Sequence, residues 1–522
     1  MSNRITSGYP LRFAALVLSL TVAMAAARAD SSFDDGMALR AKAVTAAEFQ
    51  TVIRKLQTSA AAGNGKAMIA LGDIYGDPST PVFDEAVAIS FYKVAKDMGQ
   101  LAQSYRGIAT LYRSTEGAYH DSEAALQNFE LAAALGDTAA ASAASDMYTH
   151  GEGARADEQK AAYFFKRAIA AGAVTDAAAK LADLYRSPEG SLFDIAEAVR
   201  LYKLAFSAGD SYSLIALGDI HADGEAGLPD EDAAKEYFEL ARTAGRAREA
   251  DRRLASIYRS PQGKLHEPAT AWRLYESAAA GGDSYALLAL ADMRVNGEAG
   301  PADPVAAMQY YIKARDAGLG KDAARGMAAI QRTATGPLHD IEAAIKNYEL
   351  AASLGDSASL VDIGDIYFYG EGVAADHARA KANYEKAQSQ GLQKETSRRL
   401  ALIYQMRSSI FYDPARAEEL FERSAALGDA RSLISLADLY SAGGAFLLNE
   451  ERAKPFLDKA IASGLVADAT RKLAALYRSP DGALHDPAMA VKLYMKAADL
   501  GDTASMTALG EMYAHGEYSG QP

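Results

Sequence analysis

The chain has 522 residues, of which 49% are hydrophobic and 23% are charged, and its formal net charge is −14. This length allows several domains or one extended array, and the acidic balance argues against nucleic-acid binding, which needs a basic surface. Because the sequence contains no cysteine, it has no disulfide, thiol nucleophile, zinc ribbon or lipid-modified N-terminal cysteine.

The first residues have the layout of a secretory signal peptide. Arg4 and Arg12 precede an apolar run from Phe13 to Met24, and Ala27-Arg28-Ala29 offers small residues at both positions of a cleavage site. This run is too short to span a bilayer as a helix of the mature protein. We therefore expect residues 1–29 to be removed. The mature protein is predicted to be periplasmic, with neither a transmembrane helix nor a lipid anchor.

Residues 45–516 are predicted to form an array of helical repeats, between an N-terminal linker at 30–44 and a C-terminal tail at 517–522. One anchor position, mostly tyrosine, and one glycine position recur with spacings that alternate between 37 and 36 residues. The period is therefore 73 residues and contains two unequal repeats. The anchor positions are Tyr75, Tyr112, Tyr148, Tyr185, His221, Tyr258, Arg294, Gln331, Tyr367, Tyr404, Tyr440, Tyr477 and Tyr513.

Each repeat is predicted to contain two helices, helix A and helix B. Helix A carries apolar residues at helical spacing and ends at Ser-Pro-x-Gly in one repeat type and at Gly-Glu-x-Gly in the other. Helix B begins at a periodic, mostly aspartate position that suits an N-cap, and it ends at the glycine of the register. Pro268, Pro304, Pro414 and Pro487 follow the cap, at the favoured first helical position.

The chain ends nine residues after Tyr513, where the register places the start of another helix B. Either the chain is truncated here or another segment covers the last helix A.

This pattern resembles the Sel1-like repeat family, a relative of the tetratricopeptide repeats. The resemblance rests on Ala-x-x-x-Leu-Gly-x-x-Tyr-x-x-Gly-x-Gly, a following Asp, and Tyr-x-x-Ala-x-x-x-Gly, with copies at 360–373 and 384–387. It implies an all-α fold, an α/α solenoid wound as a right-handed superhelix, that works as a protein-interaction scaffold.

No sequence feature points to catalysis, a cofactor or a metal site. Six of the eight histidines occupy equivalent positions in the register, where loop packing and capping are expected, and His377, which follows a cap aspartate, is interpreted in the same way. The Gly-Glu-x-Gly turns lie between helices and carry a carboxylate, which would repel phosphate. We therefore expect a protein that is not an enzyme.

Departures from the anchor tyrosine give the candidate partner-binding residues: His221, Arg294, Gln331 and the adjacent Arg332. Solenoids bind through local variation on a regular surface, although drift at a half-exposed position gives the same pattern. Trp272, the single tryptophan, is either a packing residue or a binding anchor.

The Tyr-Arg-Ser-Pro copies at 185–188, 258–261 and 477–480 admit two interpretations. Their arginines either form a ladder for an anionic polymer or bond the last carbonyls of helix A.

The predicted function is a non-enzymatic scaffold of the cell envelope that supports synthesis or secretion of an alginate-like exopolysaccharide. Residues 476–482 and His485-Asp486-Pro487 look similar to the periplasmic scaffold of alginate-type secretion, which implies an outer-membrane porin or a polysaccharide-modifying enzyme as partner. That scaffold is a lipoprotein, whereas this chain has no cysteine to lipidate. Two alternatives remain: a periplasmic regulator that restrains a sensor kinase, and a glycan-binding module, which Trp272 fluorescence would detect.

Overall fold

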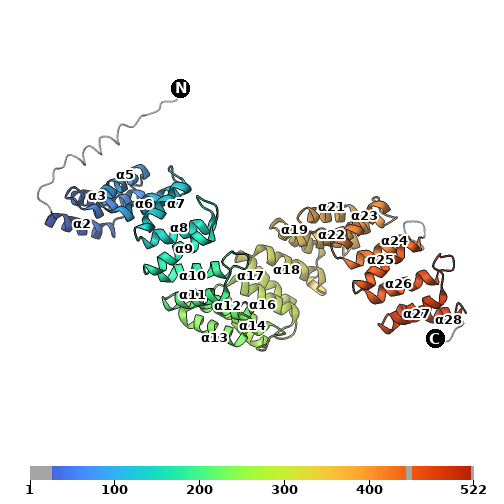
Figure 1. Cartoon of the computed structure of the whole chain (residues 1–522). Helices are drawn as coiled ribbons and strands as arrows, with labels where there is room; N and C mark the ends of the chain where they lie inside the picture. The colour runs from blue at the N-terminus through green and yellow to red at the C-terminus, as the bar shows by residue number, and fades with distance from the viewer. Residues whose placement is uncertain (1–25, 442–448, 519–522) are drawn as a thin grey trace, which may run out of the picture. The chain divides into compact units, whose positions relative to one another are not determined.

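A computed structural model describes residues 26–441 and 449–518, with side chains from residue 31 onward. All regular structure in this part of the chain is helical, which confirms the all-α prediction (Figure 1). Most of the predicted signal peptide, residues 1–25, lies outside the described residues. Two compact units divide the chain, one up to Glu267 and the other from Pro268. No helix in the described ranges combines the length and the apolar character that a bilayer crossing needs.

Helices A and B alternate through both units, helix A with even and helix B with odd labels. The first unit contains α2 (Ala26–Arg40), α3 (Ala46–Ala61), α4 (Gly65–Gly76), α5 (Glu85–Asp97), α6 (Leu101–Arg113), α7 (Ser122–Ala134), α8 (Thr138–His150), α9 (Glu158–Ala170), α10 (Val174–Arg186), α11 (Ile195–Ser207), α12 (Tyr212–Asp223), α13 (Glu231–Ala241), the short wide turn η1 (Arg242–Arg246) and α14 (Ala247–Arg259).

The second unit continues the alternation. It contains α15 (Pro268–Ala280), α16 (Ser284–Asn296), α17 (Pro304–Asp316), α18 (Gly320–Thr333), the 3₁₀ turn η2 (Gly336–Leu338), α19 (Ile341–Ser353), α20 (Ser357–Tyr369), α21 (His377–Ser389), α22 (Gln393–Gln405), α23 (Pro414–Ala426), α24 (Ala430–Tyr440), α25 (Glu450–Ala462), α26 (Val466–Arg478), α27 (Pro487–Asp499) and α28 (Thr503–Ala514).

The predicted ends of helix B are confirmed. The cap aspartates, and Asn449 in their register, accept a hydrogen bond from a backbone N–H in the first helical turn. All thirteen glycines of the glycine register have φ between +86° and +104°, a conformation that side chains with a Cβ rarely adopt. Pro268, Pro304, Pro414 and Pro487 each open a helix as predicted.

Small residues allow neighbouring helices to approach closely. One alanine register of helix B, from Ala88 to Ala490, is completely buried. Glycines of helix A make room for aromatic rings of helix B: a Cβ on Gly72 would lie 2.6 Å from Cε1 of Tyr92. Within each unit, the core therefore consists of small residues and rings that neighbouring repeats share, as expected for a solenoid.

The segment predicted as a linker, residues 30–44, is helical over most of its length. Phe33 and Met37 of α2 pack on the cluster that contains Leu56 of α3, and a Cβ on Gly36 would lie 2.9 Å from Cδ2 of Leu56. This repeats the contact of Gly72 with Tyr92. Helix α2 is thus a further helix A in which Leu39 replaces the anchor tyrosine, so the array begins before residue 45.

Candidate partner-binding surface

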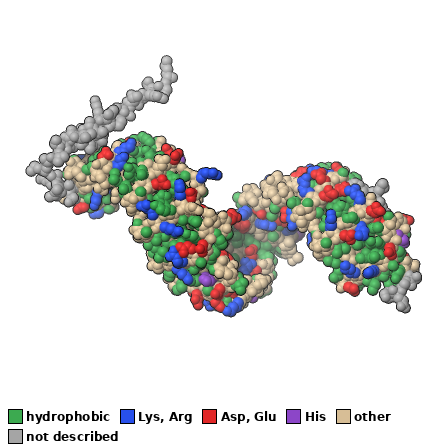
Figure 2. Space-filling view, viewed as in Figure 1, with side chains coloured by type: hydrophobic (Ala, Val, Ile, Leu, Met, Phe, Trp, Pro, Cys, Tyr) green, Lys and Arg blue, Asp and Glu red, His purple; other side chains and the backbone are tan. Residues whose placement is uncertain are grey.

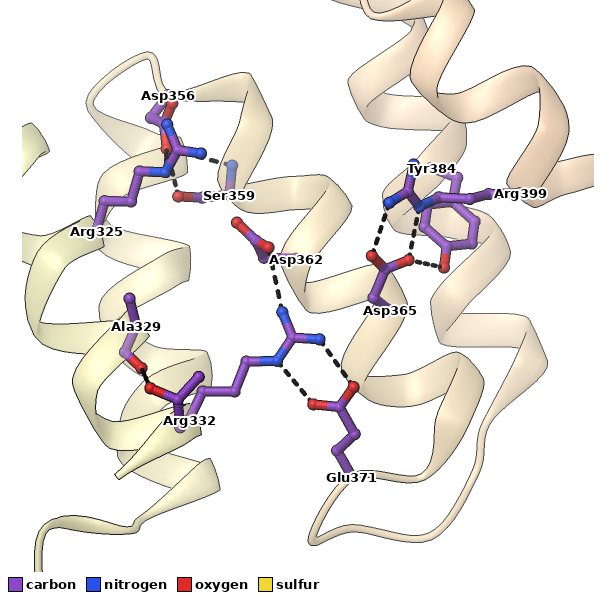
Figure 3. A network of polar contacts seen from close by, with 11 residues as sticks. Arg325, Ala329, Arg332, Asp356, Ser359, Asp362, Asp365, Glu371, Tyr384 and Arg399 are labelled. Carbon is purple, nitrogen blue, oxygen red and sulfur yellow. Dashed lines mark hydrogen bonds and ion pairs between the residues drawn. The ribbon is translucent and has the colours of Figure 1, made fainter. Parts of the chain in front are cut away.

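Arginines at the end of helix A form a regular tie between repeats. Arg113 donates from Nε and Nη2 to the carboxylate of Glu152 at 2.8 and 3.0 Å. Arg332 pairs with Glu371 in the same way at 2.7 and 2.8 Å (Figure 3). Each glutamate lies 39 residues after its arginine, in the Gly-Glu turn of the following repeat. Two further pairs repeat the arrangement: Arg186–Glu225 and Arg478–Glu517.

In two of the three Tyr-Arg-Ser-Pro copies, this tie replaces both interpretations of the arginine. Arg186 and Arg478 bond carboxylates of the next repeat rather than carbonyls of their own helix, and the pairing neutralises their charge. They are therefore not available to bind an anionic polymer. Glu517, in the segment predicted as a tail, belongs to the last of these ties. On the visible face of each unit, Lys and Arg side chains lie among Asp and Glu side chains (Figure 2).

The tie of Arg113 to Glu152 predicts a stability contribution that depends on pH. Hydrogen bonds from Arg113 lower the pKa of Glu152. A carboxylate whose pKa falls on folding stabilises the folded state above its unfolded pKa of about 4.3, and the contribution is lost as the pH falls through the lower folded-state value. Glu152→Gln should therefore speed amide exchange in α6 and α8 at pH 7 and have a smaller effect near pH 3. Equal effects at both pH values, after correction for intrinsic exchange rates, would contradict the tie.

A network of ion pairs surrounds α20 (Figure 3). Asp362 accepts a hydrogen bond of 3.1 Å from Arg332 of α18, and Asp365 accepts bonds of 2.7 and 2.9 Å from Arg399 of α22. Tyr384 of α21 donates to the same Asp365 at 2.6 Å. Three successive A helices and one B helix are thereby fixed relative to one another, so these charges serve the frame of the array.

A glutamate at the start of helix B forms a second regular tie. Its carboxylate accepts a backbone N–H from the loop after the following helix A, as Glu85 does from Ala118 at 2.8 Å. Glycine precedes the donor in that loop because a Cβ on Gly117 would lie 2.3 Å from Oε1 of Glu85. The equivalent pairs are Glu158–Ser191, Glu231–Leu265 and Glu450–Leu484.

The second tie is interrupted in the second unit. The 73-residue register places Pro304 and His377 where the other copies have this glutamate, and neither side chain supplies a carboxylate. In the loop that would meet His377, Ser409 replaces the glycine. The ring of His377 lies instead 5.5 Å from the ring of Phe368.

A recess of about 770 Å³ opens at the interruption. Its walls are the outer side chains of α19, the loop into α21 and the loop of Ser409, and its lining includes Glu342, Ile345, Lys346, Glu349, Tyr367, Asp376, His377, Arg379, Ser408, Ser409 and Ile410. Ser409 is buried, whereas Ile410 next to it is 89% exposed. The regular surface of the array is thus replaced here by a hollow with an exposed aliphatic residue at its edge.

One anchor row follows the 73-residue period and consists of Tyr75, Tyr148, His221, Arg294, Tyr367, Tyr440 and Tyr513. Next to three of its tyrosines lies a cation from a residue 12 positions later: Lys160, Arg379 and Arg452 lie 4.8, 5.2 and 4.4 Å from the ring centroids of Tyr148, Tyr367 and Tyr440. These three tyrosines therefore each have a cation over the ring.

A profile described as "Sel1 repeat" matches most of the chain. The matched residues are 65–100, 101–137, 138–172, 175–210, 211–245, 248–283, 284–319, 321–356, 357–392, 397–429, 467–502 and 503–522. The chain belongs to the Sel1 repeat family. Sel1 repeats generally mediate protein–protein interaction, and their fold is typically a non-catalytic scaffold. Between the matched segments at 397–429 and 467–502, α24 and α25 keep the same register with Tyr440 and Gly464.

Solved structures include similar helical arrays. A protective antigen of uropathogenic Escherichia coli strains with an SLR fold is 21% identical, with a TM-score of 0.49 over 90% of this chain and 98% of its own. A Sel1 repeat protein from Oxalobacter formigenes is 25% identical, with a TM-score of 0.34 over 44% of this chain and 99% of its own. No curated protein matches the chain.

The predicted partner-binding residues of this Sel1 array lie in both units, His221 in the first and the other three in the second. His221 of α12 stacks on Tyr237 with ring centroids 5.4 Å apart. In the second unit, Gln331 accepts a hydrogen bond from Asn347 at 2.8 Å, and Arg332 is held by Glu371 and Asp362. Arg294 of α16 lies over the indole ring of Trp272, 4.2 Å from its centroid. The side chains of Arg294 and His221 have no hydrogen bond or ion pair among the described residues, and the Nε of Arg294 is buried.

Sequence reasoning missed the interruption at His377. The signal was present, because comparing residues 73 positions apart shows Glu231, Pro304, His377 and Glu450 in one column. The regular cap aspartate before His377 favours an ordinary loop residue, which hides the interruption in the sequence. Among the described residues, no three His, Asp or Glu side chains gather as metal ligands would.

Proposed function

We propose that this Sel1 repeat protein is a non-enzymatic scaffold of the cell envelope that brings together proteins of exopolysaccharide synthesis or secretion. The family supports a protein-binding role. Support for export comes from the arginines, apolar run and Ala27-Arg28-Ala29 of the first 29 residues. The exopolysaccharide role draws on the resemblance of residues 476–487 to the scaffold of alginate-type secretion. The expected partner is an outer-membrane porin or a polysaccharide-modifying enzyme.

The recess beside Ile410 is the observation that carries the docking role. An exposed aliphatic side chain bordered by charged groups matches the apolar core and polar rim of protein interfaces. Arg379 is engaged by Tyr367 at 3.0 Å and by Asp376 at 3.5 Å, so the carboxylates of Glu342 and Glu349 outweigh the charge of Lys346 in the remaining lining. We therefore expect the occupant to be a partner loop that carries an apolar and a basic side chain.

Export is tested by fusing alkaline phosphatase to the C-terminus of the full chain. The phosphatase needs disulfides, which form in the periplasm and not in the cytoplasm. We expect the fusion to be active in intact cells and a matched fusion that lacks residues 1–29 to be inactive. Equal activity of both, or inactivity of the full-length fusion, would contradict an envelope location.

The role in secretion is tested by deleting the protein and measuring exopolysaccharide in the medium. Secretion is expected to fall, and complementation by Leu228→Asp should restore it, whereas Ile410→Asp should not. Leu228 is a matched control because it is also a loop residue and is 91% exposed. Increased secretion after deletion would instead indicate the restraint of a sensor kinase. Unchanged secretion would exclude both roles.

A further inference from the structure

In the second unit, the cation of Arg294 lies over an aromatic ring that in turn contacts a second ring. The guanidinium carbon of Arg294, on α16, lies 4.2 Å from the ring centroid of Trp272 on α15. The indole of Trp272 in turn meets the ring of Tyr310 on α17 edge-on, with centroids 5.8 Å apart and planes at 82°. Burial and the nearby Glu276 raise the pKa of Tyr310, and Arg294 opposes that rise.

Unlike Arg294, the cations that lie over tyrosines of the anchor row each have a hydrogen-bond acceptor. Lys160 bonds the hydroxyl of Tyr148 at 3.2 Å, Arg379 bonds that of Tyr367 at 3.0 Å, and Arg452 bonds the carboxylate of Glu418 at 2.9 Å. In these copies the tyrosine is the anchor and the cation comes from helix B. At Arg294 the order is inverted: the anchor itself is the cation, and Ala306 occupies the position 12 residues later.

Arg294 has no such acceptor. Its Nε is buried and makes no hydrogen bond, and within residues 26–441 and 449–518 no carboxylate forms an ion pair with its guanidinium. Stacking on an indole satisfies the face of the guanidinium but leaves its in-plane N–H donors unused. Because Nε is buried, an incoming acceptor meets the Nη groups, whose N–H donors have no partner among the described residues.

We propose that Arg294 binds a carboxylate of an acidic segment in a protein partner. A carboxylate matches the fork of a guanidinium, and Arg and Trp are typical of the residues that dominate binding energy at protein interfaces. The guanidinium covers one face of the indole, so recognition falls on its N–H groups rather than on a platform where a sugar ring would stack. This inference rests on the proposed scaffold role and adds a second contact, at different residues from Ile410.

The single tryptophan of the chain makes this contact directly measurable. Full-length protein labelled with 5-fluorotryptophan gives one ¹⁹F resonance, because Trp272 is the only tryptophan. Titration with a hexaglutamate peptide is expected to move that resonance in a saturable manner, and 0.5 M NaCl should weaken the effect because exposed charges are screened. Hexaglutamine, which has the same length without charge, should leave the resonance in place.

Arg294→Gln should abolish the titration, and Arg294→Lys should weaken it by about tenfold because lysine lacks the planar fork. Arg452→Gln is the matched control: Arg452 is also stacked on an anchor ring but already has Glu418 as its partner, so the titration should persist. A hexaglutamate response that is absent, or equal in Arg294→Gln, would overturn the proposal. A response to trigalacturonate at lower concentration than to hexaglutamate would overturn the peptide as occupant. None of these results depends on docking at Ile410, so the two proposals fail separately.

Discussion

Replacing Gly364 with alanine is expected to destabilise the packing of α20 on α21 by about 1–3 kcal/mol, the usual cost of an overpacked core. A Cβ at this position would lie 2.4 Å from Cε1 of Tyr384. The tyrosine ring cannot move away easily, because it is 1% exposed and its hydroxyl is bonded to Asp365 at 2.6 Å. Since opening of a repeat array is local, amide exchange should accelerate mainly in α20 and α21.

The same substitution at Gly510 should have the opposite sign. Gly510 occupies the register position of Gly364 two periods later, but no atom within 4 Å of its added Cβ is present among the described residues. Alanine is favoured over glycine inside a helix by about 0.5–1 kcal/mol, so Gly510→Ala should slow exchange in α28. Destabilisation of similar size at both positions would show that helix geometry, and not the ring of Tyr384, explains the glycine.

Arg332→Met is expected to destabilise the region from α18 to α20 by about 2 kcal/mol. This value lies between the cost of breaking a buried ion pair and that of breaking an exposed one, because the side chain of Arg332 is 18% exposed. Methionine keeps most of the volume but leaves the carboxylates of Asp362 and Glu371 without their cation. Amide exchange of α18 and α20 measures the loss.

The effect of Arg332→Met should also depend on pH. Burial raises the pKa of Asp362, and Arg332 opposes that rise. An aspartate with a raised pKa favours the folded state at low pH and loses this contribution as the pH rises through its folded-state pKa. Removing the cation should therefore cost most near pH 7 and less near pH 4. Arg416→Met, which breaks an exposed pair with Glu419 inside one helix turn, should change stability by less than about 0.5 kcal/mol at either pH.

Most of the fold is predictable from the sequence because the same local signals for the ends of helix B recur in successive repeats. Cap aspartates, first-turn prolines and glycines with positive φ are local requirements, so each predicted helix B is found at its predicted place. Helix α2 escaped the prediction because its first residues fall in the predicted signal peptide and Leu39 stands in place of the anchor tyrosine. Only packing against Leu56 identifies it as part of the array.

The candidate surface was harder to predict because its ties join residues 33 and 39 positions apart. Arg332 forms the same ion pair with the next repeat as the equivalent arginines do, even though its neighbour Gln331 replaces an anchor tyrosine. The sequence shows that Arg294 replaces an anchor tyrosine. It does not show that the guanidinium of Arg294 lies against aromatic rings without a hydrogen-bond acceptor, because that depends on how Trp272 and Tyr310 pack.

The central claim, that the second unit docks an envelope protein beside Ile410, is tested most directly by site-specific crosslinking in cells. A photoreactive phenylalanine analogue is placed at position 410 or, as the matched control, at position 228, and trapped proteins are identified by mass spectrometry. We predict that position 410 traps an outer-membrane porin or a polysaccharide-modifying enzyme and that position 228 does not. A sensor kinase trapped at position 410, or the same proteins trapped equally from both positions, would contradict the account.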